Sequence, residues 1–288
     1  MLKELYHFLL HLRLHYQLLI LSGGYLLGGF MAGEMNTLQY WVQFLNVHVL
    51  LYGGATAYNS WWDKDTGPIG GLKNPPQMNR WMHPVSLLFM FLGVWFAMSV
   101  GWAFSALFFV SLFLFWLYST PHARWKSRPL LSLFAISIST GFNSVLMGTL
   151  AAGGAIALVT VLSAVGASLI LLSLYPVSQI FQIEEDTRRR DQTFVLVYGV
   201  SGMKKFFLAS FTTGAMLLGG SVLVFDTTAG TLLLVGTAIC GIVIARLIMR
   251  LKGISEEYGL VMKTKFLASL SFVVFFLAGN IIRHGWLS

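Results

Sequence analysis

Oxygen-bearing side chains gather in the polar stretch of residues 58–80, directly after an apolar run. Asn59 and Asp63 are four residues apart, so on a continuing helix they share one face. Asp65 adds a second carboxylate, and a Gly- and Pro-rich loop with Lys73 follows. Carboxylate and amide oxygens are suitable Mg²⁺ ligands, and basic loops bind phosphate. The stretch therefore indicates a magnesium and phosphate site, with a solvated loop between two membrane helices as the alternative.

A second cluster of the same kind lies at residues 175–191. Gln182 and Asp186 repeat the four-residue spacing of the first cluster, and Glu185 lies between them. Three consecutive arginines follow, the last of which is Arg190. These arginines either orient the protein in the membrane or bind phosphate. Two helix ends with oxygen ligands, each followed by a basic segment, can share a divalent metal and a diphosphate.

A third polar loop, residues 118–129, begins at Tyr118 and carries Lys126 and Arg128. It contains hydroxyl donors and three cations, including Arg124, but no carboxylate. If it closes over the other two clusters, it adds donors and positive charge to a shared site.

Long apolar runs must position these loops. Of the 288 residues, 56% are hydrophobic and 10% are charged, and the mean hydropathy is +0.73, whereas soluble domains carry about 25% charged residues. We therefore expect an all-α, polytopic membrane protein with about nine transmembrane helices around a central, lipid-accessible cavity. The expected spans are 17–33, 38–58, 84–101, 103–119, 130–151, 155–175, 206–225, 229–249 and 264–282.

The basic residues predict how these spans are oriented. With nine spans, 18 of the 19 lysines and arginines fall on one side, and only Arg283 falls on the other. The positive-inside rule makes the richer side cytoplasmic. The three polar loops lie on that side, so we expect an active site at the cytoplasmic face, a cytoplasmic N-terminus and an external C-terminus. The same distribution explains the net charge of +8 without a nucleic-acid partner.

Residues 1–16 mix Leu and Phe with charged and His residues, which is typical of an interfacial helix lying on the membrane surface. We expect this helix to lead into a single domain that occupies residues 1–288. The lone cysteine, Cys240, lies in an apolar run and excludes a disulfide within the chain.

Taken together, the three loops resemble those of the UbiA superfamily of intramembrane prenyltransferases, over essentially the whole chain. Asn59 and Asp63 match the first Asn and the central Asp of the family motif Asn-Asp-x-x-Asp-x-x-x-Asp, while Ser60 and Gly67 replace the other aspartates. Asp186 matches the second Asp of the motif Asp-x-x-x-Asp, and Gln182 stands in place of the first. Tyr118 and Lys126 match a Tyr and a Lys that contact diphosphate in the family.

The resemblance implies Mg²⁺-dependent transfer of a polyprenyl group from a prenyl diphosphate to an aromatic or other lipid-soluble acceptor, as in quinone biosynthesis. It implies the following roles: catalysis by Asp63, Asp186, Tyr118 and Lys126; diphosphate binding by Asn59, Lys73, Arg128, Arg190 and Gln182; metal binding by Asp63, Asp65, Glu185 and Asp186. Because Gly67 and Gln182 replace aspartates, the number of metals stays open, as do prenyl length, acceptor identity and oligomeric state.

Two alternatives are weighed against this function. A UbiA-like terpene cyclase would share the metal site and need no acceptor. A transporter would carry charged residues within its spans and internal repeats, whereas here polar residues gather at one face and no convincing repeat is seen.

The topology can be tested directly. We expect reporter fusions to place the N-terminus in the cytoplasm and the C-terminus outside, because an odd number of spans puts the two ends on opposite sides. If both reporters were found on one side, the count of nine spans would be wrong.

Overall fold

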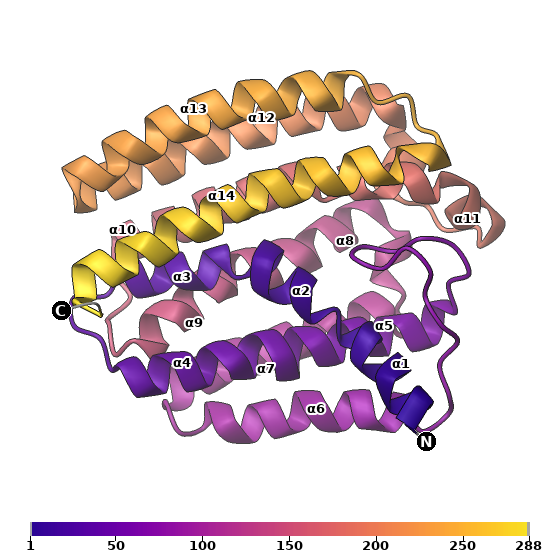
Figure 1. Ribbon diagram of the computed structural model, residues 1–288, viewed down its shortest axis with the longest axis horizontal. Helices are drawn as coiled ribbons and strands as arrows, with labels where there is room; N and C mark the ends of the chain where they lie inside the picture. The colour runs from indigo at the N-terminus through magenta and orange to yellow at the C-terminus, as the bar shows by residue number, and fades with distance from the viewer. Residues whose placement is uncertain (1, 287–288) are drawn as a thin grey trace.

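The computed structural model describes residues 2–286. Apart from one bridge between Ile69 and Leu72, these residues form helices and loops, as Figure 1 shows. The α-helices are α1 (Leu2–Leu12), α2 (Leu14–Tyr16), α3 (Gly23–Phe30), α4 (Thr37–Leu45), α5 (Gly54–Asp63), α6 (Met82–Ala97), α7 (Trp102–Ser119), α8 (Pro129–Ile136), α9 (Asn143–Ala151), α10 (Leu158–Leu174), α11 (Ile183–Arg188), α12 (Phe194–Phe225), α13 (Thr227–Met249) and α14 (Tyr258–His284).

Several of these helices join end to end through π-helical turns, in which the chain accommodates an extra residue. Such turns are η1 (Gln17–Leu21) between α2 and α3, η2 (Asn46–Gly53) between α4 and α5, and η4 (Ser137–Phe142) between α8 and α9. In the part of the chain that the structure describes, six helices are long and apolar enough to cross a membrane. The prediction of an all-helical polytopic membrane protein is confirmed, and nine spans is an approximate count.

Two boundaries differ from the sequence expectation for physical reasons. Helix α12 begins at Phe194, twelve residues before the expected span, because a helix can continue past its apolar segment into polar surroundings; it is interrupted at Gly199, whose φ of 69° requires left-handed backbone. Helix α10 ends at Leu174, and the 3₁₀ segment η5 (Pro176–Gln182) follows. Pro176 cannot donate a backbone hydrogen bond and so ends the regular helix.

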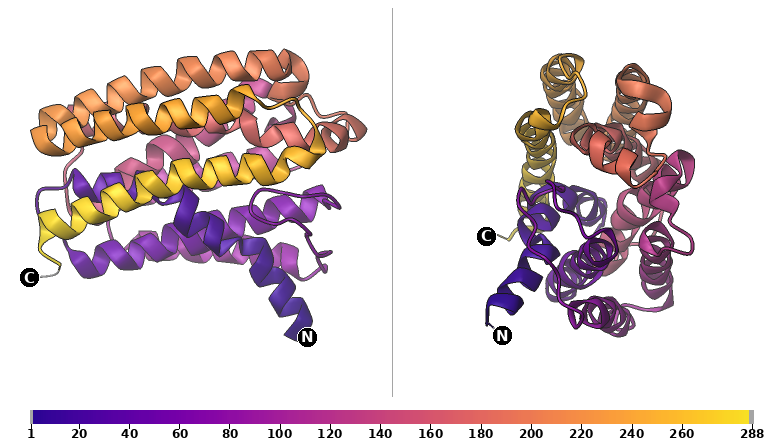
Figure 2. Two further views of the ribbon diagram at one scale, coloured as in Figure 1. Left: turned by 45° about the horizontal axis from the view of Figure 1, so that its top comes forward. Right: turned by 90° about the vertical axis from the view of Figure 1, so that its right-hand side faces the viewer.

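Most of the helices run side by side along the length of the bundle, as the two views in Figure 2 show. Helix α12 packs against both α10 and α13, and α3 packs against α9. The final helix, α14, contacts α13 on one side and α3 on the other. The last element of the chain thus closes the arrangement against the first span.

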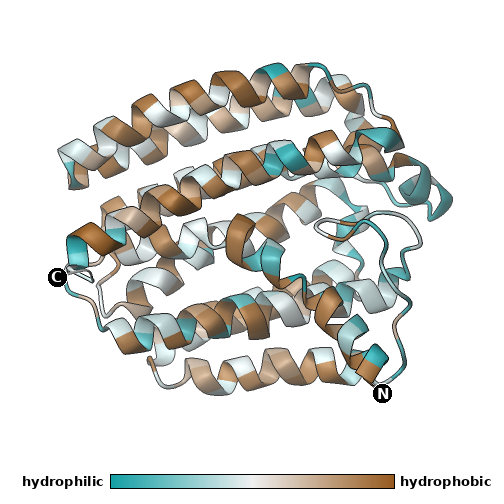
Figure 3. Ribbon diagram, viewed as in Figure 1, coloured by the Kyte–Doolittle hydropathy of each residue, from teal (hydrophilic) through white to brown (hydrophobic). Residues whose placement is uncertain are grey.

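Hydrophilic residues concentrate at one end of the bundle, around α11 and the loop of residues 64–81 (Figure 3). Helix α1 begins toward this end, and α14 ends at the opposite one (Figure 1).

Helix α1 packs Phe8 and Leu12 against Ala57 and Met82 while Leu5 and Leu9 stay exposed. This division of apolar residues is what an interfacial helix requires.

Two glycines allow α3 and α9 to approach closely. A Cβ atom at Gly28 would collide with the carbonyl oxygen of Val145, and one at Gly148 with that of Tyr25. Thr149 also donates a hydrogen bond to the carbonyl of Gly28 at 3.0 Å. Small residues at such crossings permit the backbone approach by which membrane helices pack.

We expect Gly28→Ala to lower the unfolding temperature of the protein in detergent, because the added methyl group forces two backbones apart. Overpacking of this kind costs about 1–3 kcal/mol. Gly220→Ala on α12 is the control, since nothing lies within 4 Å of a Cβ at that position. Equal unfolding temperatures for the two variants would contradict close packing at this crossing.

Candidate active site

A cavity of about 390 Å³ lies between the helices. Its polar wall contains Asp63, Lys126, Asp186 and Arg189, and its apolar wall includes Ile20, Phe115, Leu171, Phe272 and Phe275. The cavity therefore combines a charged region with space for an apolar chain.

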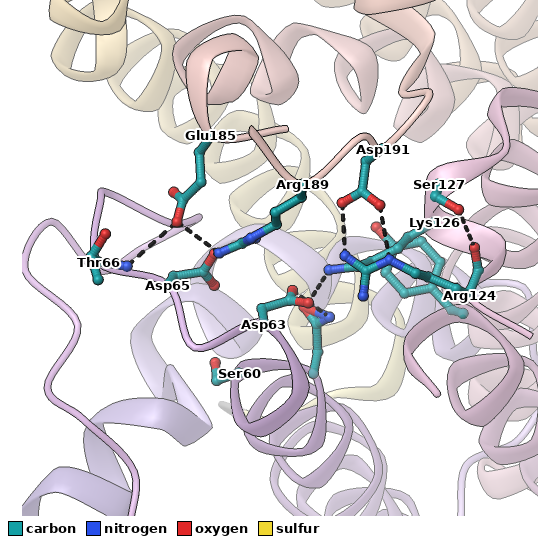
Figure 4. Close-up of polar contacts among 12 residues, drawn as sticks. Ser60, Asp63, Asp65, Thr66, Arg124, Lys126, Ser127, Glu185, Arg189 and Asp191 are labelled. Atoms are coloured by element: carbon teal, nitrogen blue, oxygen red, sulfur yellow. Dashed lines mark hydrogen bonds and ion pairs between the residues drawn. The ribbon is translucent and has the colours of Figure 1, made fainter. Parts of the chain in front are cut away.

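Asp63 occupies the last position of α5 and faces this cavity. Asn59, one turn earlier, donates a hydrogen bond from Nδ2 to Asp63 Oδ2 at 2.9 Å, so the two residues share a face as predicted. Lys126 Nζ forms an ion pair with the other oxygen, Asp63 Oδ1 (Figure 4). The helix ends here because Lys64 adopts a left-handed conformation, with φ of 50°. The first and third polar loops thus meet at Asp63.

Asp65 lies just beyond the end of α5 and is only 6% exposed. Arg189 Nη2 bridges two carboxylates, at 2.7 Å from Asp65 Oδ1 and 2.6 Å from Glu185 Oε1. Burial raises the pKa of Asp65, the neighbouring charge of Asp63 raises it further, and Arg189 opposes both effects. Arg189 therefore joins the first acidic cluster to the second.

Asp186 and Gln182 both line the cavity. They do not share a continuous helix, because η5 ends at Gln182 and α11 begins after it. Gln182 Nε2 donates a long hydrogen bond of 3.4 Å to the carbonyl of Pro68. Asp186 is 8% exposed and interacts electrostatically with Asp191, Lys126 and Arg189. Both residues thus line one cavity, although the four-residue spacing did not predict the change from 3₁₀ to α-helix between them.

The third loop is held to the second by Arg124 and Asp191. Arg124 Nε and Nη2 donate to Asp191 Oδ1 and Oδ2, both at 2.8 Å (Figure 4). The hydrogen bond to Asp191 raises the pKa of Arg124. Such a two-point arginine–carboxylate contact fixes geometry as well as charge. Sequence reasoning missed this pair, because nothing local relates residues 67 positions apart.

The side chain of Tyr118 belongs to the same site, and its hydroxyl lies 2.8 Å from the hydroxyl of Tyr175. Both tyrosines line the cavity. Since either oxygen can be the donor, one hydroxyl proton remains available to a ligand.

The loop of residues 64–81 is tied down over this end of the bundle by backbone carbonyl contacts. His11 Nε2 lies 2.8 Å from the carbonyl of Pro76, and His15 Nε2 lies 2.7 Å from that of Gly71. Burial lowers the pKa of His11 to about 4, so its ring is neutral near pH 7 and donates from Nε2. Tyr258 donates to the carbonyl of Ile69 at 3.4 Å. Residues from both ends of the chain thus position the loop.

The structure places three predicted diphosphate ligands away from the cavity. Lys73, Arg128 and Arg190 are exposed and do not line it. In the arginine run, Arg189 lines the cavity instead. It follows the last residue of α11, and Arg190 after it has a left-handed backbone with φ of 58°, which turns the chain between the two residues. Glu185, a predicted metal ligand, does not line the cavity either. Its carboxylate accepts hydrogen bonds from Arg189 and from the backbone amide of Thr66.

Two cavity-lining cations were not predicted as site residues. Arg13 is 9% exposed and Lys265 is 7% exposed. A sequence signal existed for Lys265, which lies at the start of an expected apolar span, where ionisable residues usually have a function. For Arg13, the amphipathic pattern of the N-terminal helix gave no such indication.

The carboxylates fit a metal that arrives with phosphate ligands. Among residues 2–286, no group of three or more His, Cys, Asp or Glu residues could hold a metal ion alone. Asp63 and Asp65 are instead paired with Lys126 and Arg189. Mg²⁺ is commonly held by one or two carboxylates together with substrate phosphates, rather than by a protein cage. The donor set is thus suited to a magnesium–diphosphate ligand.

Comparison with known proteins identifies the family of this chain. The profile of the UbiA prenyltransferase family matches residues 21–270. The chain belongs to the UbiA prenyltransferase family. No curated protein sequence matches it.

Solved structures of family members share the fold. A UbiA homolog from Archaeoglobus fulgidus bound to DMAPP and Mg²⁺ has a TM-score of 0.75 at 16% identity, covering 96% of this chain and 99% of that one. The apo structure of a UbiA homolog from Aeropyrum pernix K1 has a TM-score of 0.67 at 20% identity, covering 93% and 98%. A structure described as digeranylgeranylglyceryl phosphate synthase has a TM-score of 0.60 at 18% identity, covering 97% and 99%.

We expect Asp191→Asn to destabilise the protein, because Arg124 then loses a buried carboxylate partner. A hydrogen bond to a charged group contributes about 1.5–3 kcal/mol. In a double-mutant cycle of thermal unfolding in detergent, Arg124→Gln and Asp191→Asn should be less than additive. Arg128→Gln, at an exposed position four residues from Arg124, is the control and should have little effect. Strict additivity would show that the pair is not coupled.

Proposed function

We propose that this protein transfers a polyprenyl group from a prenyl diphosphate to a lipid-soluble acceptor, with Mg²⁺ as cofactor. The observation that carries the proposal is the cavity itself, in which Asp63, Lys126, Asp186 and Arg189 converge beside an apolar wall. A prenyl diphosphate has the same two parts, a polyanionic head and an apolar tail. The protein would act at the cytoplasmic face of the membrane, where the basic loops lie.

The diphosphate head would occupy the charged wall. Lys126 and Arg189 would contribute point charge and planar hydrogen bonds to phosphate oxygens, and Tyr118 a hydroxyl donor. These cations already sit opposite Asp63 and Asp65, so ligand binding would exchange carboxylate partners for phosphate partners. Asn59 would hold Asp63 in its orientation through their hydrogen bond.

Asp63 and Asp186, with Asp65 nearby, would hold Mg²⁺ together with diphosphate oxygens. The metal would supply positive charge that stabilises the departing diphosphate. Lys126 and Arg189 would add fixed charge at the same place, where negative charge increases in the transition state. Gln182, which is neutral, would orient the site without adding charge.

The apolar wall would bind the prenyl tail and exclude water from the reacting carbon. Aromatic rings of Tyr52, Phe115, Phe272 and Phe275 line the cavity and could stabilise an allylic cation through their π faces. The acceptor would be an aromatic or other lipid-soluble compound, as in quinone biosynthesis.

Turnover experiments separate this proposal from its alternatives. Purified protein would be incubated with Mg²⁺, labelled prenyl diphosphates of several lengths and a panel of quinone precursors. Prenylated acceptor supports transfer. Cyclised product from the donor alone would instead support a terpene cyclase, and uptake into vesicles without chemical change would support a transporter.

We expect Asp63→Asn and Asp186→Asn each to reduce turnover at least about a thousandfold, equivalent to about 4 kcal/mol of transition-state stabilisation. Each substitution removes a carboxylate from the proposed metal site and keeps the shape of the side chain. The control is Glu256→Gln, in the cytoplasmic loop outside the cavity lining. Near-normal turnover by either well-folded variant would rule out the assigned metal ligands.

A further inference from the structure

The guanidinium of Arg189 joins the two acidic clusters in the way that a bridging metal ion would. Its Nη2 lies 2.7 Å from Asp65 Oδ1, in the first cluster, and 2.6 Å from Glu185 Oε1, in the second (Figure 4). Carboxylates from two segments around one positive centre are also the usual surroundings of a bound divalent ion. An ion that bridged the same two oxygens would have to displace Arg189.

The backbone holds Arg189 in this place. Its amide donates to the carbonyl of Glu185 at 3.1 Å, so the two residues lie one helical turn apart, a spacing at which opposite charges meet. Directly after it, Arg190 has a left-handed backbone with φ of 58°. The amide of Asp191 then bonds back to the carbonyl of Asp186 at 3.0 Å. Because the chain turns immediately behind Arg189, the guanidinium is a fixed part of the site.

The space beside residue 67 is taken up by the same group of side chains. Gly67 stands where the family motif has its last aspartate, and a Cβ atom there would lie 3.1 Å from Glu185 Oε2. The amide of Thr66 donates to the other oxygen of Glu185 at 3.4 Å. Glu185 therefore fills the place toward which a side chain at position 67 would project, and Arg189 balances its charge.

Arg189 also has donors to spare. In the part of the chain that the structure describes, its side chain donates hydrogen bonds from Nη2 only. A guanidinium has five N–H donors, so Nε and Nη1 can bind a ligand while Nη2 keeps both carboxylates. Arg189 lines the cavity and interacts electrostatically with Asp63 and Asp186. It can therefore hold carboxylates on one side and phosphate oxygens on the other.

We propose that Arg189 is a built-in cation that takes the place of a second metal ion, so that the site binds a single Mg²⁺ with the diphosphate. Asp63 and Asp186 hold that ion. The positive charge that would otherwise bridge the two acidic clusters is supplied by the chain itself.

This inference rests on the proposed function and narrows it for two residues. Lys126 exchanges its carboxylate partner for phosphate when the donor binds. Arg189 instead keeps Asp65 and Glu185 and binds phosphate through its remaining donors. Asp65 and Glu185, which were predicted as metal ligands, then serve to position the arginine.

The test counts bound metal and does not depend on turnover. Mn²⁺ replaces Mg²⁺, because the electron paramagnetic resonance signal of free Mn²⁺ is lost on binding. The protein in detergent is mixed with an equal amount of geranyl thiolodiphosphate, whose carbon–sulfur bond resists cleavage, and the analogue without protein is the blank. We expect about one Mn²⁺ per native protein, held by two carboxylates and the diphosphate. Binding of two ions by the native protein overturns the inference.

Substitution of the arginine should create a second metal site. Arg189→Gln leaves Asp65 and Glu185 without their cation, so this variant should bind two Mn²⁺. Arg189→Lys keeps the charge and should bind one. Arg188→Gln is the matched control, because Arg188 is the preceding residue, is exposed and loses the same charge; it should also bind one. A folded Arg189→Gln variant that binds only one ion shows that Arg189 does not occupy a metal position.

A second comparison applies even where Arg189→Gln fails to fold. Asp63 is assigned to the metal and Asp65 to the arginine, so Asp63→Asn should weaken Mn²⁺ binding at least about tenfold more than Asp65→Asn. Equal losses in the two variants would make Asp65 a metal ligand and overturn the inference.

Turnover separates the failure of this inference from that of the proposed function. Two bound ions together with prenyl transfer would refute the inference and leave the function standing. One bound ion without transfer to any acceptor would refute the function and leave the metal count standing. A native protein that binds no Mn²⁺ with the analogue would refute both.

Discussion

Pairing of charge inside an apolar bundle is the constraint on which this structure depends. Removing an ion from water costs several kcal/mol unless a partner compensates for it. Three ion pairs supply such partners: Lys126 balances the charge of Asp63, Arg189 that of Asp65, and Arg124 that of Asp191. Each pair joins two segments that are far apart in sequence, so the pairs hold the three polar loops at the mouth of one cavity. The same pairs keep charge available there for a ligand that can replace one partner.

This arrangement explains why the site is incomplete as a metal centre and suitable as a diphosphate site. A preformed cluster of free carboxylates would repel a diphosphate in the absence of metal. Here Asp63 and Asp65 are paired with Lys126 and Arg189, which can themselves bind phosphate. The net charge of the site therefore changes little when a metal and a diphosphate enter together. Replacement of family aspartates by Gly67 and Gln182 lowers the negative charge further.

Local sequence was sufficient for some of these features and not for others. The spacing of Asn59 and Asp63 predicted that they share a face, because both lie on one regular helix, where they form a hydrogen bond. The same spacing at Gln182 and Asp186 predicted a shared cavity but not the break in the helix between them. The choice of Arg189 over Arg190, and the burial of Arg13 and Lys265, depend on how segments from distant parts of the chain pack. Periodicity within one segment carries no information about that packing.

The π-helical turn η2 lies in the span that carries Asp63. It changes the direction in which side chains after the turn point, relative to those before it. In an α-helix each residue turns the chain by about 100°, so one extra residue rotates everything beyond it by that amount. Before the turn, Tyr40 and Gln43 face the protein interior; after it, Asn59 and Asp63 face the cavity. A single-residue deletion in this turn would therefore leave the part of the span before the turn in place and rotate Asp63 away from Lys126. The orientation of Asp63 toward Lys126 is thus set by a turn that ends at Gly53, well before Asp63 in the same span.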